Sequence, residues 1–244
     1  MAVPSLTKSQ TIEGCMFSLS RAIEEFSIRR QEKVLTKKFE AGRINALEHV
    51  FNVPMETLKG LFSNAIEDFK LDYPRVENLG SIGIEAFLVT LNVEINSFPP
   101  CLNLIKKGKK EISHNHFEQG GKHTLVAHDD EFGGRNIRLL TNDVELVKSL
   151  ADAKYGPPPP WVVWYDLGPH PYNQGNEQHW SVYVWNPYWL SLSLEEQDKF
   201  IESWRDRTKS YISDEEWDSW IFKIRFADPK SKFLYMKQNG IDDD

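Results

Sequence analysis

Up to Phe69, apolar residues recur at steps of three and four, which is the spacing of one face of a helix. The first stripe consists of Ile12, Met16, Leu19, Ile23 and Phe26. The second follows Pro54 and consists of Met55, Leu58, Leu61, Phe62, Ala65, Ile66 and Phe69. The pattern predicts a helical N-terminal segment with two helices, the second ending before Pro74.

The period then changes to the alternation of a half-buried strand. It predicts a long strand over 87–95, and a second strand through Ile112, His114 and His116. The runs 124–128 and 136–140 are joined through Phe132-Gly133-Gly134 and favour a hairpin. Asn142 with Glu145 three residues later is typical of the start of a short helix.

After the run Pro157–Pro160, we expect strands over 161–167 and 179–185, separated by a loop rich in Gly, Pro and Asn. Ser193 with Glu196, and Ser213 with Glu216, are capping boxes that predict two helices. Two further strands are expected over 221–226 and 233–237. The predicted fold is therefore α+β, with a helical N-terminal segment followed by a mostly antiparallel sheet with short helices.

Charge and tryptophan are distributed unevenly on the two sides of the proline run. Residues 1–150 carry 19 Lys and Arg against 20 Asp and Glu, whereas the remainder carries 10 against 16, so most of the net charge of −7 lies in the last third. All eight tryptophans also follow the prolines. This division favours a helical and β-rich region over 1–156 and a Trp-rich acidic α+β segment over 157–244, either as two domains or as one continuous domain.

Composition narrows the class of protein. The longest strongly apolar run, near 161–165, is far shorter than a membrane span. Two cysteines, Cys15 and Cys101, do not make a disulfide framework, and we expect a cytoplasmic protein. The net charge of −7 disfavours binding to duplex nucleic acid.

Histidines give one functional hypothesis, because six of the seven lie between His114 and His179. Imidazole and carboxylate are common ligands of zinc and iron. The candidate ligands are His114, His116, His128, Asp130 and His179. They would define a metal-dependent enzyme, either a hydrolase or an oxygenase, with a divalent cofactor.

Acidic residues beside aromatic ones give the leading hypothesis, because charged fields speed association and aromatic side chains anchor interfaces. The candidate contact residues are Asp214, Glu215, Glu216, Trp217 and Asp218, together with His170 and Tyr172 in the loop after residue 167. Since no complete catalytic motif is present, we expect a non-enzymatic protein without a cofactor. It would occlude a protein partner with a basic surface, as inhibitor, immunity or antagonist proteins do.

Overall fold

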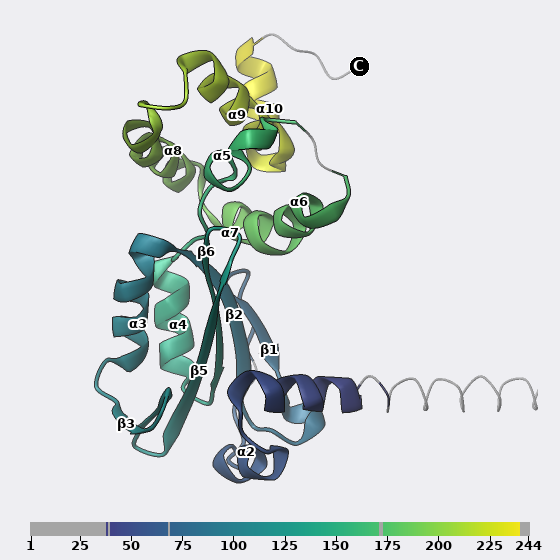
Figure 1. Cartoon of the computed structure of the whole chain (residues 1–244), viewed down its shortest axis with the longest axis vertical. Helices are drawn as coiled ribbons and strands as arrows, with labels where there is room; N and C mark the ends of the chain where they lie inside the picture. The colour runs from purple at the N-terminus through teal and green to yellow at the C-terminus, as the bar shows by residue number, and fades with distance from the viewer. Residues whose placement is uncertain (1–37, 39, 68, 171–172, 240–244) are drawn as a thin grey trace, which may run out of the picture. The chain divides into compact units, whose positions relative to one another are not determined.

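The computed structural model describes residues 38, 40–67, 69–170 and 173–239 (Figure 1). Contacts divide the chain into two compact units, Met1–Thr57 and Leu58–Asp244. In the first unit, residues 40–51 are helical, and the carboxylate of Glu48 accepts the backbone N–H of Met55 at 2.6 Å. The next helix, α2 (Met55–Leu61), spans the division and is shorter than the predicted stripe. The helix predicted over 12–26 lies outside the described residues.

The second unit contains a six-stranded antiparallel sheet in the order β1-β2-β6-β5-β4-β3. Its strands are β1 (Arg75–Asn78), β2 (Phe87–Glu94), β3 (Lys110–Ser113), β4 (His116–Gln119), β5 (Lys122–Glu131) and β6 (Gly134–Thr141). The expected antiparallel sheet, with the long strand that begins at Phe87 and the following hairpin, is confirmed.

Two helices, α3 (Phe98–Lys106) and α4 (Val144–Ala153), pack together beside the sheet (Figure 1). Their buried residues share one core with alternate residues of β2 and β6. On the sheet these are Phe87, Val89, Leu91, Ile137 and Leu139; on the helices they are Cys101, Ile105, Leu146, Val147 and Leu150. The period of two along the strands therefore selects the face that the helices cover.

The predicted strand through Ile112, His114 and His116 is wrong, because the chain reverses between β3 and β4. Asn115 adopts a positive φ of 56° at this turn, a conformation that Asn tolerates better than most residues. His114 and His116 therefore do not point to one face of a single strand. The helix α4 begins one residue later than the predicted cap, since Asp143 accepts the N–H of Leu146.

The four strands predicted after the prolines are also wrong, because this part of the chain is helical where the structure describes it. Its elements are α5 (Pro160–Val163), η3 (Tyr165–Leu167), α6 (Gly175–Trp180), η4 (Ser181–Trp185), α7 (Asn186–Ser191), α8 (Leu194–Thr208), α9 (Asp214–Ala227) and α10 (Pro229–Asn239). Both predicted capping boxes are present at the starts of α8 and α9. Aromatic and β-branched residues favour strands in general, but here tertiary packing of their rings overrides that preference.

Packing of the tryptophan rings explains why residues 175–191 are helical and do not form a strand. The segment η4 is a turn of π-helix that continues α6 and leads into α7. Its i to i+5 repeat brings Trp180 over Trp185, with centroids 5.7 Å apart and planes at 13°. Trp189, one α-helical turn further on, stacks on Trp185 at 5.3 Å. Three indoles thus form one continuous stack, which a strand with alternating sides cannot build.

The tryptophan core and the sheet core belong to the same compact unit and form one buried cluster. Whether the proline run divides the chain into two domains, as the sequence allows, stays a prediction. Glu94, at the end of β2, donates its backbone N–H to the carbonyl of Gly156, the residue directly before the proline run, at 2.8 Å. The Glu94 carboxylate also binds the guanidinium of Arg207 on α8 at 3.0 Å.

Gly156 gives a direct test of this junction. A Cβ atom at position 156 would overlap the ring of Tyr188, which is buried and also packs against Tyr73. We expect Gly156→Ala to lower the free energy of unfolding by about 1–3 kcal/mol or more, because the overpacked ring must move. Urea melts of the variant measure this change.

Gly60→Ala is the matched control, since Gly60 lies in α2 with nothing within 4 Å of the added Cβ. It should be neutral or stabilising by up to about 1 kcal/mol. Equal effects of the two substitutions would show that Tyr188 does not hold the junction.

Candidate functional site

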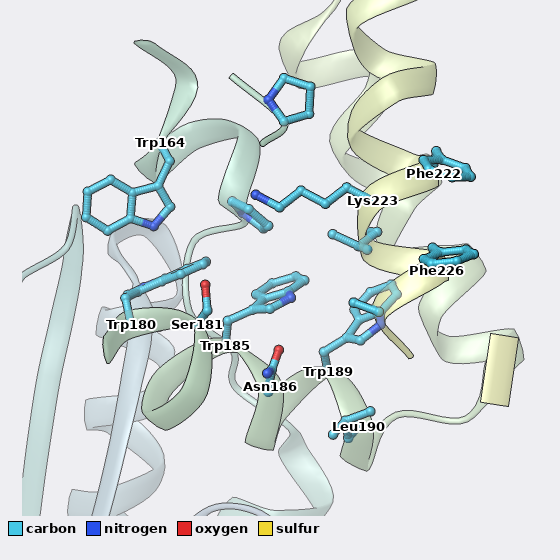
Figure 2. A pocket seen from close by; sticks show the side chains of 14 residues that line it. Trp164, Trp180, Ser181, Trp185, Asn186, Trp189, Leu190, Phe222, Lys223 and Phe226 are labelled. Carbon is cyan, nitrogen blue, oxygen red and sulfur yellow. The ribbon is translucent and has the colours of Figure 1, made fainter. Parts of the chain in front are cut away.

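The C-terminal helices surround a pocket of about 380 Å³ (Figure 2). This volume is within the range of small-ligand sites. Six aromatic side chains contribute to its walls: Trp164, Trp180, Trp185, Trp189, Phe222 and Phe226. Its polar side chains are Ser181, Asn186 and Lys223, and its lining within the described chain includes no carboxylate.

Two opposed elements build the pocket. The continuous segment of α6, the π-helical turn and α7 places the indole stack and Ser181 on one wall, and α9 supplies Phe222, Lys223 and Phe226 on the other side. Figure 2 shows the Lys223 side chain extended from α9 toward the tryptophan side of the cavity, whereas Phe222 and Phe226 lie on the outer side of the helix. The pocket is therefore apolar and aromatic, with one cationic group.

The environment of Lys223 is unusual for a lysine. Its ammonium lies 5.0 Å from the centroid of the Trp220 ring, a cation–π arrangement. Burial lowers the pKa of Lys223 to about 8, because desolvation disfavours the charged form. At neutral pH the amine is still mainly protonated, so the pocket holds a poorly hydrated positive charge that favours an anionic ligand.

A second feature is the exposed stripe of α9, which we define as Glu215, Asp218, Phe222 and Phe226. These residues follow one another at steps of three and four, so they share one helix face, and all are exposed. Phe222 and Phe226 are 41% and 40% exposed and stack with centroids 5.4 Å apart. The stripe thus joins two acids directly to an aromatic pair.

The other acidic residues predicted here have structural partners. Asp214 forms an ion pair with Arg205. Glu216 accepts the backbone N–H and the hydroxyl of Ser213, and these hydrogen bonds lower its pKa. Trp217 is buried, with its ring 4.9 Å from that of Trp161. Glu215 and Asp218 are therefore the predicted acids on the stripe.

The predicted loop after residue 167 is shorter than expected, since α6 begins at Gly175. His170 is exposed and follows Pro169, which lines the pocket. Tyr172 lies outside the described residues. The loop therefore places His170 next to the pocket in sequence.

The structure does not gather the five candidate metal ligands. His114 is exposed and contacts Asn115, and His128 packs against Phe98 at 5.0 Å. His179 lies on α6 near Tyr183, whereas Asp130 pairs with Arg135 on β6. Throughout the described chain, no group of three or more His, Cys, Asp or Glu side chains is placed to hold a metal ion.

His116 has a different partner. Its Nε2 lies 3.2 Å from Nδ1 of His123, and the ring of His123 also packs edge-on against Phe62. His116 is 7% exposed, and burial followed by the nearby His123 lowers its pKa. The two rings thus contact each other on neighbouring strands, with His116 buried and His123 half-buried.

Sequence reasoning missed Lys223, Phe222 and Phe226 as site residues because it placed them on a strand. In a strand, Lys223 would point away from both phenylalanines. The available signal was Trp217, Trp220 and Ile224, which recur at helical spacing directly after the capping box at Ser213. Extending that helix to residue 226 would have placed Phe222 and Phe226 on one face with Glu215 and Asp218, and Lys223 on the same helix.

Comparisons with known proteins give no relative from which a function could be carried over. No protein-family model matches the chain, and neither a curated protein nor a solved structure does. Across the described residues, no helix combines the length and apolar character that crossing a membrane requires.

The histidine pair predicts a pH dependence of stability. The lowered pKa of His116 means that the unfolded chain binds a proton at a pH where the folded chain does not. Its contribution is fully present above the unfolded pKa of about 6.5 and is lost as the pH falls toward the lowered folded value. Urea melts between pH 8 and pH 5 should therefore show falling stability, by less than about 1.4 kcal/mol per pH unit from this group.

His116→Gln should flatten that slope, whereas His114→Gln, at the exposed turn, should leave it unchanged. If the His116 variant kept the full slope of the wild-type protein, the pair would not be its source.

Proposed function

We propose that the protein acts by binding, occluding a protein partner that presents a basic surface, and that the exposed stripe of α9 is its contact surface. The observation that carries this proposal is the stacked, solvent-exposed pair Phe222 and Phe226 one turn from Asp218. Exposed aromatic side chains are the usual anchors of protein interfaces. Adjacent acids add steering of a cationic partner.

The net negative charge of the last third of the chain also favours a basic partner. The last third of the chain holds six of the seven net negative charges. A basic partner would therefore approach the C-terminal helices along a favourable field.

We also infer a cytoplasmic location. Two cysteines in 244 residues suit a reducing compartment. The described cysteine, Cys101, is free and buried, and desolvation raises its pKa to about 12, which disfavours the thiolate at neutral pH.

Selection of short random peptides on the immobilised protein tests the partner's chemistry. We expect the enriched peptides to combine Lys or Arg with a large apolar residue. The association rate of a selected peptide should fall as salt rises from 0.05 to 0.5 M, because the screening length shrinks from roughly 14 Å to about 4 Å. Glu215→Lys with Asp218→Lys should slow association, and Phe222→Ala with Phe226→Ala should speed dissociation.

The control is Glu145→Lys with Asp152→Lys, which reverses two exposed acids on α4 and should change neither rate. Peptides that bind the stripe variants as tightly as the wild-type protein would contradict the role given to α9.

A further inference from the structure

The pocket of Figure 2 shares Phe222 and Phe226 with the outer stripe but neither of its acids, and its lining points to a particular ligand chemistry. We propose that it binds a small aromatic carboxylate, with the ring system among the tryptophans and the carboxylate against Lys223. This inference does not rest on the proposed partner, because it depends on the interior wall of α9 and not on the exposed acids.

The aromatic half of the ligand follows from the walls. Trp164, Trp180 and Trp185 lie on one side of the cavity, and Lys223 extends toward them from α9. Aromatic pairs with centroids 4.5–7 Å apart gain about 0.5–1.5 kcal/mol beyond their buried area. A planar ring therefore gains more here than a flexible aliphatic chain of equal size.

The size of the ligand follows from the cavity. A volume of about 380 Å³ lies near the lower end of the range for small-molecule sites. One or two fused rings with a short acidic group fit this volume, whereas a large cofactor does not.

The carboxylate follows from Lys223. Among the described residues that line the pocket, Lys223 is the charged one, and the lining also includes six aromatic rings, Ser181 and Asn186. A protonated amine that has lost part of its hydration gains most from an ionic acceptor. The hydroxyl and the amide of those two polar residues add donors on the opposite wall, which suit the second carboxylate oxygen.

Calorimetric titration with naphthoate, naphthylmethanol and octanoate tests separately the need for the carboxylate and the need for the aromatic ring of the ligand. Wild-type protein should bind naphthoate saturably, and at least about tenfold more tightly than either other compound. Lys223→Met should lower naphthoate affinity to that of naphthylmethanol without changing naphthylmethanol itself. Lys232→Met is the matched control, since Lys232 lies over the Phe226 ring from α10 and does not line the pocket; it should leave naphthoate binding unchanged.

Ser181→Leu provides a second variant that fills the cavity from the tryptophan side and should abolish binding of naphthoate and naphthylmethanol. Unfolding midpoints of all variants, followed by circular dichroism, show whether each one is folded. Absence of saturable naphthoate binding to the wild-type protein would overturn the proposal. So would equal affinities for naphthoate and naphthylmethanol, or naphthoate binding that survives both Lys223→Met and Ser181→Leu in folded proteins.

Discussion

Stacking of three indoles along one irregular helix is the constraint on which the C-terminal half of the molecule depends. Trp180, Trp185 and Trp189 align only because a π-helical turn separates the first two. Regular α-helix would rotate Trp185 away from Trp180, since five residues are not a whole number of α-helical turns. The π turn therefore sets which rings enter the core, and through them the position of α8, whose Phe200 contacts both Trp185 and Trp189.

The indole stack is linked to the sheet through contacts of Tyr188, Gly156 and Glu94. Gly156 lies against Tyr188, and the Tyr188 ring contacts both Trp185 and Phe200. On the sheet side, the carboxylate of Glu94 at the end of β2 forms an ion pair with Arg207, and its backbone N–H donates to the carbonyl of Gly156. Gly156, directly before the prolines, thus contacts both the end of β2 at Glu94 and the aromatic cluster at Tyr188.

Sequence patterns anticipated the regular parts of this fold. Alternation along Phe87–Glu94 predicted β2, and the capping boxes at Ser193 and Ser213 predicted α8 and α9, because each signal arises from local geometry. The helices α6 and α7 were not predicted, because their aromatic residues resemble a strand in composition and their π turn breaks the α-helical period. The hairpin at Asn115 was missed for a related reason, since Ile112, His114 and His116 alternate across a turn as they would along a strand.

The candidate site shows the same limit, because it is a product of ring packing and not of a motif. Large rigid rings fill space unevenly, so a wall of indoles facing a helix that carries Phe222 and Phe226 leaves a cavity where smaller side chains would interdigitate. Within the described chain, the indole N–H groups of Trp164, Trp180 and Trp189 are buried and have no hydrogen-bond partner in the protein. Those donors lie inside the wall and not at its surface, so the polar character of the cavity comes from Lys223, Ser181 and Asn186. In the helix 214–227, Lys223 extends toward that wall while Phe222 and Phe226 lie on the outer side, so one helix carries both the cation of the pocket and the exposed stripe.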